Sequence, residues 1–315
     1  MCLMLADRAG GACGRGIKMR IGIDLGGTKT EIIVLDEHGA DLFRHREATP
    51  ANDYGAILES IARLVALAES SAGKAESVGI ATPGVISPRT GLMKNSNTIV
   101  LNDRPLDRDL ANRLQRPVRL ENDANCLALS EAIDGAAAEA KVVFGVILGT
   151  GVGGGIVVGK QLLVGHNRVA GEWGHNPLPW AREEDLPGDT CYCGKVGCIE
   201  TFLSGAGLSR DFRYRTGKEC TAQEISGAAA LGDGEARDCI EIYQDRLARS
   251  LASVVNLIDP EAIVLGGGLS NIVELYDELP QLIANYAFSD ALDTVVLRAL
   301  HGDSSGVRGA ARLWR

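Results

Sequence analysis

Three glycine-rich segments are candidates for binding phosphate groups, and each follows a short apolar run: residues 24–29, 149–155 and 266–268. Glycine lets backbone N–H groups approach phosphate oxygens without a side-chain clash. In the first segment, Asp24 could ligate Mg²⁺, which prefers oxygen ligands, and Thr28 and Lys29 could contact the phosphates. A tight turn would explain any one of the segments. Three of them, together with Asp24, favour glycine turns that hold a nucleotide from two sides.

Two common glycine motifs are excluded by their sequence context. Residues 149–154 match the string G-x-G-x-x-G, but a dinucleotide-binding fold needs a helix directly afterwards, and residues 155–165 are rich in β-branched and turn residues. Residues 22–29 approach a P-loop, yet Thr28 stands where that motif requires Lys. The sequence therefore argues against a nicotinamide dehydrogenase and against a Walker-type ATPase.

A group of cysteines is the third candidate for chemistry. Three of the eight cysteines lie close together as Cys191, Cys193 and Cys198, and His175 precedes them. A Cys₃His set suits a tetrahedral structural Zn²⁺, and clustered cysteines in a chain without secretory features indicate metal ligands rather than disulfides. Because Cys-x-Cys-x₄-Cys is not the commonest zinc spacing, reduced core thiols are an equal alternative from these residues alone.

The elements that position these residues follow from the apolar periodicity. Helical spacing predicts helices over residues 54–72, 122–134 and 240–258. Short β-branched runs predict strands over residues 20–24, 31–35, 78–81, 118–120, 142–148, 156–158, 161–164 and 262–265. The pattern is mixed α/β. The two strand–glycine units near residues 24 and 149 suggest two related halves that face one cleft.

Composition restricts the class of protein. The 315 residues are enough for two modest domains, and a net charge of −9 without a dense Lys/Arg run argues against nucleic-acid binding. No apolar run approaches the roughly 18–20 residues of a membrane span. Residues 1–18 lack the apolar stretch of a signal peptide, so we expect a cytoplasmic protein. We interpret these residues as an extension upstream of a true start at Met19, or otherwise as a disordered tail.

Six segments, in this order, resemble the ROK family of sugar kinases and sugar-responsive repressors: DLGGTKTE (24–31), LENDANC (120–126), LGTGVGGG (148–155), AGEWGH (170–175), CYCGKVGCIETF (191–202) and IVLGGG (263–268). The likeness covers nearly the whole chain from Met19. The stretches at 171–180, 191–205 and 301–311 are similar to the manno(fructo)kinase (fructokinase) members in particular.

The resemblance implies an actin-like ATPase (ribonuclease H-like) fold, with two α/β domains around a central cleft. We expect a smaller domain over residues 19–120, a larger one over 121–303, and a C-terminal helix at about 304–315 that packs back on the first. ATP would lie in the cleft, with Mg²⁺ on Asp24. The expected phosphate contacts are Gly26, Gly27, Thr28, Lys29, Gly149, Thr150, Gly151 and Gly153, and the adenosine would lie near Gly266, Gly267 and Gly268.

For the sugar, the resemblance implies Asp123 as the catalytic base, because a kinase needs a carboxylate to orient the acceptor hydroxyl and take its proton. From the residues alone, an N-cap at this helix start is the better explanation. The expectation that Asp123 is the catalytic base therefore depends on the resemblance. The expected sugar-binding residues are Gly84, Asn122, Asp123, Glu172, His175 and Glu200. The resemblance also favours zinc on His175, Cys191, Cys193 and Cys198, with the second ring nitrogen of His175 facing the sugar.

The expected function is ATP-dependent transfer of the γ-phosphate to the 6-hydroxyl of fructose, with mannose or glucose as further substrates and a homodimer as the assembly. A glucokinase or an N-acetylhexosamine kinase is the alternative, because the hydroxyl-binding residues are shared across the family. A sugar-sensing repressor would need a helical DNA-binding domain, and the 18 residues before the first strand are too few for one.

Overall fold

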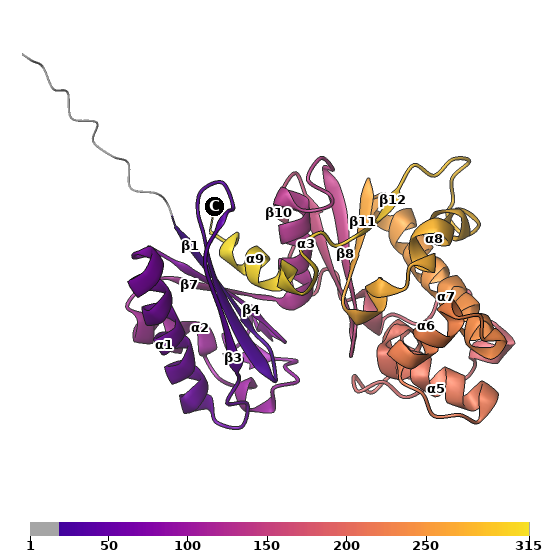
Figure 1. Cartoon of the computed structure of the whole chain (residues 1–315), viewed down its shortest axis with the longest axis horizontal. Helices are drawn as coiled ribbons and strands as arrows, with labels where there is room; N and C mark the ends of the chain where they lie inside the picture. Colours follow the sequence, from indigo (N-terminus) through magenta and orange to yellow (C-terminus); the bar gives the residue numbers. More distant parts are fainter. Residues whose placement is uncertain (1–18, 315) are drawn as a thin grey trace, which may run out of the picture.

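The computed structural model describes residues 19–314, so the expectations for residues 1–18 lie outside the described part of the chain. Two lobes, each built on a five-stranded sheet, lie side by side (Figure 1). The sheet of the first lobe has the order β3-β2-β1-β4-β7. Its strands are β1 (Arg20–Leu25), β2 (Lys29–Leu35), β3 (Asp41–Ala48), β4 (Val78–Thr82) and β7 (Val118–Asn122).

Helices α1 (Tyr54–Ala72) and α2 (Leu106–Leu114) pack against this first sheet. The buried face of α1 repeats at helical spacing through Ile57, Ile61 and Leu64, and these side chains join the core of the strands. A short hairpin, β5 (Val85–Ile86) and β6 (Met93–Lys94), and the turn η1 (Ile99–Leu101) complete the lobe.

The sheet of the second lobe has the order β10-β9-β8-β11-β12. Its strands are β8 (Val142–Leu148), β9 (Val152–Val158), β10 (Gln161–Leu162), β11 (Ala262–Gly266) and β12 (Val295–Arg298). The α-helices of this lobe are α3 (Asp123–Asp134), α4 (Ile199–Leu203), α5 (Gly205–Thr216), α6 (Ala222–Ala230), α7 (Gly234–Ile258) and α8 (Glu274–Ala284). Its single-turn helices are η2 (Trp173–His175), η3 (Glu183–Asp185), η4 (Gly268–Asn271) and η5 (Gly302–Ser304).

The two sheets repeat one plan. β1 pairs antiparallel with β2, as β8 does with β9, and both hairpins continue antiparallel into a third strand. β1 then pairs parallel with β4 and β4 with β7, as β8 does with β11 and β11 with β12. This is the mixed α/β arrangement with two related halves that the strand–glycine units predict.

The glycines after β8 differ from the expected loop over residues 149–155. Strand β9 begins at Val152, and Gly153, Gly154 and Gly155 pair with β8. A Cβ at Gly155 would lie 2.7 Å from the carbonyl oxygen of Ala124, and one at Gly154 would meet the Trp173 ring at the same distance. These two glycines therefore allow close packing under the sheet. From the local sequence, glycines that serve packing cannot be distinguished from glycines that form a loop.

Most other predicted elements match within two residues at each end, for example β2 and β7, but one helix starts much earlier and one short strand ends sooner. Helix α7 begins at Gly234, six residues before the predicted 240, because the Asp233 side chain accepts a hydrogen bond of 2.9 Å from the backbone N–H of Ala236 and caps the helix there. Strand β10 covers only Gln161–Leu162 of the predicted residues 161–164.

The last helix, α9 (Ser305–Ala311), is shorter than the expected segment 304–315 and lies between the lobes (Figure 1). Glycines bring its backbone against both sides. A Cβ at Gly79 of β4 would lie 1.8 Å from the carbonyl oxygen of Ala310, and one at Gly309 would lie 1.8 Å from that of Cys126 in α3. The end of the chain is thus built into the junction of the two lobes.

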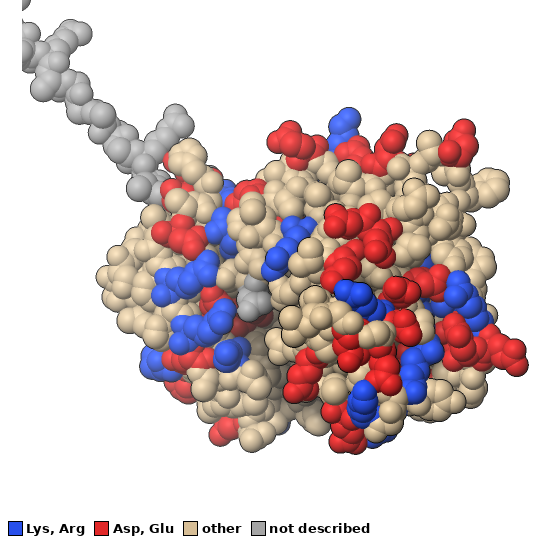
Figure 2. Space-filling view, turned by 45° about the vertical axis from the view of Figure 1, so that its right-hand side comes forward, with Lys and Arg blue, Asp and Glu red and all other residues tan. Residues whose placement is uncertain are grey.

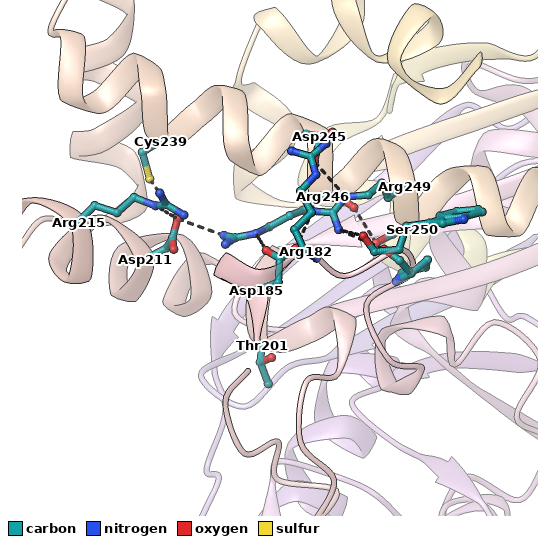
Figure 3. Close-up of polar contacts among 12 residues, drawn as sticks. Arg182, Asp185, Thr201, Asp211, Arg215, Cys239, Asp245, Arg246, Arg249 and Ser250 are labelled. Carbon is teal, nitrogen blue, oxygen red and sulfur yellow. Dashed lines mark hydrogen bonds and ion pairs between the residues drawn. The ribbon is translucent and has the colours of Figure 1, made fainter. Parts of the chain in front are cut away.

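A buried ion-pair network holds the segment that connects His175 to the cysteines (Figure 3). The Asp185 side chain is fully buried and accepts from the backbone N–H of Arg182 at 2.9 Å and from Nε of Arg246 at 2.8 Å. The oxygen that accepts from Arg182, Oδ2, also lies 3.0 Å from Nη2 of Arg249. Desolvation alone would raise the pKa of Asp185, but these donors outweigh it and hold the pKa below its usual value. The carboxylate is therefore ionised and fixes this segment against α7.

We expect Asp185→Asn to destabilise the fold by about 1.5–3 kcal/mol, because the buried guanidinium groups of Arg246 and Arg249 each lose one of their two carboxylate partners. Urea unfolding of the variant measures the change. The matched control is Glu235→Gln. Glu235 lies on α7, the helix that carries Arg246 and Arg249, and its substitution breaks an exposed ion pair with Lys218. This loss should cost no more than about 1 kcal/mol. Equal losses in the two variants would contradict the role of the buried network.

Candidate functional site

The predicted site residues gather where parallel strands end. In the first lobe, Asp24 lies in the last part of β1, residues 26–28 follow that strand, Gly84 follows β4 and Asn122 ends β7. In the second lobe, Gly149 follows β8 and Gly266 ends β11. Because the carboxyl ends of parallel strands open on the same edge of a sheet, each lobe presents its loops together, which is where open α/β sheets bind ligands.

The junction of β7 and α3 separates two roles that the sequence left open. The Asn122 side chain accepts a hydrogen bond of 2.8 Å from the backbone N–H of Asn125, so Asn122 is the N-cap of α3. The Asp123 side chain accepts a hydrogen bond of 2.8 Å from the adjacent N–H of Ala124, and it remains exposed to solvent. The cap role belongs to Asn122, and the Asp123 carboxylate is available for chemistry.

The electrostatics of Asp123 suit a base. Desolvation by the surrounding walls raises the pKa of Asp123, the N–H groups of Ala124 and Asp123 itself lower it, and the charge of Glu172 raises it further. The carboxyl is accessible and at the same time closely surrounded by protein. A carboxylate whose proton affinity is raised in this way is better able to take a proton from a hydroxyl group.

Asp24 lies at the end of β1 and faces the same region. Desolvation, followed by the negative charges of Asp123 and Glu31, raises the pKa of Asp24 to about 7. On its other side is helix α9, where a Cβ at Gly306 would lie 3.1 Å from the Asp24 carboxylate. Two carboxylates that repel each other across the junction of the lobes form a place where a hard divalent cation would be stabilised. The carboxylate oxygens of Asp24 are ligands of the kind that Mg²⁺ prefers.

We expect Asp24→Asn to raise the free energy of unfolding at pH 8 by about 1–4 kcal/mol in metal-free buffer. The folded-state pKa of about 7 lies above the unfolded value, so ionisation of Asp24 costs stability progressively from about pH 4 to pH 7. The gain from Asn should therefore be less than half as large at pH 5. Denaturant unfolding at both pH values tests this, with exposed Asp290→Asn as the control. A gain that is equal at both pH values would contradict it.

The first glycine turn is rigidly held. The backbone N–H of Gly26 donates to the carbonyl oxygen of Lys29 at 3.0 Å, and the Thr49 hydroxyl donates to the carbonyl oxygen of Gly26 at 2.8 Å. The backbone N–H of Thr49 also donates to the carbonyl oxygen of Thr28 at 3.0 Å. Gly27, Thr28 and Lys29 are themselves exposed. A preformed turn with exposed backbone is the arrangement that binding to phosphate oxygens requires.

The second and third glycine turns lie next to each other. Gly149 donates its backbone N–H to Gly151 at 3.0 Å, and the turn leaves Thr150 exposed. Gly267 has a φ of +84°, and a Cβ there would lie 2.5 Å from the carbonyl oxygen of Leu148 at the end of β8. Gly266 is buried in β11 and Gly153 lies in β9, whereas Gly268 is exposed.

A cluster of polar side chains lies beside the second turn. Glu200, in the first turn of α4, accepts a hydrogen bond of 3.1 Å from the backbone N–H of Val152. Glu172 immediately precedes η2, which contains His175. Desolvation raises the pKa of Glu172, the neighbouring His175 and Lys94 lower it, and Glu200 raises it. Two carboxylates and an imidazole provide the acceptors and donors that polyol hydroxyls need.

The sequence-predicted metal ligands come together. The Sγ atom of Cys191 lies 3.5 Å from Nδ1 of His175, and the Sγ atoms of Cys193 and Cys198 are 3.6 Å apart. All four ligand atoms lie within 4.8 Å of one another. Zn–S bonds of about 2.3 Å in a tetrahedron place the sulfur atoms about 3.8 Å apart. The cluster therefore fits Zn²⁺, with Nδ1 as the nitrogen ligand.

Two residues of this region were not predicted. The Tyr192 hydroxyl lies 3.0 Å from Nε2 of His175, and the two rings meet edge to face. The ring nitrogen that we expected to face the sugar is thus in contact with a tyrosine. Desolvation and the charges of Glu200 and Glu172 raise the pKa of Tyr192 to about 12. Lys94, on β6 of the first lobe, carried no sequence signal, because only the folded chain brings it near Glu172.

On the face shown in Figure 2, basic side chains are interspersed with acidic ones, as the net charge of −9 suggests. Among the helices of residues 19–314, none combines the length and apolar character that a membrane-spanning helix requires.

Comparisons with known proteins identify the family to which the chain belongs. The profile of the ROK family matches residues 20–315. The chain is 42% identical over 299 residues to an N-acetyl-D-glucosamine kinase of Erwinia tasmaniensis. It is 39% identical over 301 residues to an N-acetyl-D-glucosamine kinase of Haemophilus influenzae. Each alignment covers 94% of this chain and 99% of the relative.

Solved structures show the same fold. A ROK hexokinase from Thermus thermophilus matches with a TM-score of 0.82 and 33% identity, over 93% of this chain and 96% of that one. A ROK family glucokinase from Streptomyces griseus, solved in complex with glucose and AMPPNP, matches with a TM-score of 0.77 and 31% identity, over 94% and 98%. The actin-like ATPase fold predicted from the resemblance is confirmed. The chain therefore belongs to the ROK family and is a sugar kinase of that family.

Proposed function

We propose that this chain transfers the γ-phosphate of ATP to the 6-hydroxyl of N-acetyl-D-glucosamine. The observation that carries the phosphoryl-transfer assignment is the Asp123 carboxylate, which the cap at Asn122 leaves available opposite Asp24. The curated relatives named as N-acetyl-D-glucosamine kinases support the amino sugar. They favour the alternative of an N-acetylhexosamine kinase over the expected fructokinase. Fructose specificity stays a prediction from the segments at 171–180, 191–205 and 301–311.

In this proposal Asp123 accepts the proton of the acceptor hydroxyl as the phosphoryl group transfers. Glu172 and Glu200 bind other hydroxyls, and Nε2 of His175 binds one where a sugar hydroxyl replaces that of Tyr192; together they hold the acceptor at a fixed distance from the base. Backbone N–H groups of the turns at 26–29 and 149–151 would bind the phosphates. Mg²⁺, held through Asp24, would neutralise developing charge on the phosphates, and zinc on the Cys₃His set would orient His175. A cytoplasmic homodimer is the expected form.

The test is an ADP-release assay with a panel of free sugars: N-acetyl-D-glucosamine, N-acetyl-D-mannosamine, glucose, mannose and fructose. We expect the highest kcat/KM with N-acetyl-D-glucosamine, and mass spectrometry with NMR should place the phosphate on O6. A higher kcat/KM with fructose would restore the fructokinase expectation. The absence of ADP release with every sugar would contradict the proposal.

A further inference from the structure

One arginine connects the two segments that supply the acceptor site. Arg168 lies between β10 and η2, four residues before Glu172. Its side chain reaches β7, where it forms an ion pair with the Glu121 carboxylate and lies 3.4 Å from the carbonyl oxygen of Leu120. Glu121 directly precedes Asn122 and Asp123. A single guanidinium therefore connects the segment that carries Glu172 and His175 to β7, the strand directly before Asp123.

The backbone at Arg168 is adapted to this contact. Its φ is +56°, in the left-handed region that residues with a side chain seldom adopt, and its N–H donates to Gly165 at 3.2 Å. A non-glycine residue persists in such a conformation where the surrounding structure determines it. Here the turn aims the side chain away from its own lobe, toward β7.

Glu121 is fastened on its other sides as well. Its side chain is only 10% exposed, and its second oxygen accepts from the side-chain amide of Asn125 at 3.1 Å. Its carbonyl oxygen lies 3.2 Å from the Thr82 hydroxyl, which is also 2.8 Å from the carbonyl oxygen of Gly84. Desolvation raises the pKa of Glu121, and the charge of Arg168 is the first of the effects that lower it. The Arg168 guanidinium thus favours the ionised form of a buried carboxyl whose neighbours flank the acceptor site.

We propose that Arg168, acting through Glu121, is a positioning residue that sets the distance between Asp123 and the hydroxyl-binding Glu172 and His175. The inference rests on the proposed function, because it assigns these residues to one acceptor sugar. Both contacts come from one nitrogen, Nη2, which meets the Glu121 carboxylate and the Leu120 carbonyl together. A lysine would keep the charge and lose the planar guanidinium that the site holds.

Arg168→Ala should raise the KM for the sugar and lower kcat, with a combined loss of about 10²-fold in kcat/KM, since small displacements of a reacting group have effects of this size. The KM for ATP should change little. Arg168→Lys should fall between the wild type and Arg168→Ala. In a double-mutant cycle, Glu121→Gln should have a smaller effect in the Arg168→Ala background than in the wild type.

The control is Arg116→Ala, which removes another partly buried Arg–Glu pair, with Glu69, inside the first lobe. It should lower the melting temperature without changing the KM for the sugar. All variants are assayed below their melting temperatures. An Arg168→Ala enzyme with the wild-type sugar KM, whatever its stability, would overturn the positioning role. If Arg168→Ala does not fold, the same comparison is made with Arg168→Lys.

Chemical rescue separates positioning from general damage. A cavity of about 410 Å³ borders the ion pair, with Arg168 and Glu121 in its lining together with Ile86 and Leu162. Guanidinium ion at millimolar concentration should therefore reach the space left by Arg168→Ala and restore part of the lost kcat/KM. Urea, a neutral planar analogue, should not. Equal effects of the two compounds would count against the ion pair as the cause.

A readout that needs no substrate distinguishes this inference from the proposed function. Hydrogen–deuterium exchange of peptides covering residues 120–126 and 169–176 should become faster in Arg168→Ala and stay unchanged in Arg116→Ala. A wild type that phosphorylates none of the sugars would contradict the function but leave this structural result intact. Unchanged exchange in both peptides would overturn the connection itself.

Discussion

Asp123→Asn should lower kcat by about 10²–10⁴-fold, the usual contribution of a general base, while the KM values for sugar and ATP change little. Asn keeps the size of the side chain and removes its ability to take a proton. Steady-state kinetics measure the change. If the variant keeps more than about a tenth of the wild-type activity, an effect below roughly 1.4 kcal/mol, Asp123 is not the base.

The neighbouring Asn122 supplies a control for the structural role. Asn122→Ala removes the hydrogen bond of 2.8 Å that caps α3 and should cost about 0.5–2 kcal/mol of stability. Asp123→Asn should cost none, because the cap of α3 is the Asn122 side chain and the Asp123 side chain accepts from the adjacent N–H of Ala124, a bond that the amide oxygen of Asn can keep. A cap-sized loss in Asp123→Asn with normal activity would return Asp123 to a structural role.

The pH dependence of the wild type follows from the same group. Desolvation raises the pKa of Asp123, so the carboxyl becomes protonated, and unable to accept a proton, at a higher pH than an ordinary aspartate at about pH 4. The kcat/KM should therefore fall as the pH is lowered, and the midpoint of this fall should lie above about pH 4. The acid limb should be absent from the residual activity of Asp123→Asn.

Loss of the metal should weaken sugar binding and leave ATP binding intact. We expect about one zinc per chain by elemental analysis and less than a tenth of that in Cys198→Ala. The KM for the sugar should rise by about 10–100-fold. Cys198 is followed two residues later by Glu200, whose carboxylate receives the Val152 N–H at 3.1 Å. Without the metal, both His175 and Glu200 lose their fixed positions.

The control for the metal experiment is Cys220→Ala, a cysteine outside the cluster. It should retain the zinc, the melting temperature and both KM values, whereas Cys198→Ala should also melt at a lower temperature because metal binding contributes to folding. Metal-free wild-type protein with full activity and stability would show that the cluster consists only of packed thiols.

Several elements could be read directly from local pattern. The helix over residues 54–72 and the strand over 142–148 have the predicted bounds, because apolar spacing and flanking turn residues are local signals. The Cys₃His set was also evident, since its members lie within 24 residues of one another and are chemically distinctive. The expectation that Asp123 is the catalytic base came from the family resemblance. Its position at a helix start did not by itself predict that role.

The sequence by itself indicated the α/β class, the turns around residues 26–28 and 149–151 and the grouping of three cysteines with His175, because these depend on residue type and short spacing. Only the tertiary structure decided which residue caps α3, which glycines serve packing under β9, and which charges meet. Arg168 and Glu121 are 47 residues apart, and Asp185 meets Arg246 across 61. Such pairs form because separate elements pack together. Periodicity along the chain does not predict which charged side chain will face which partner.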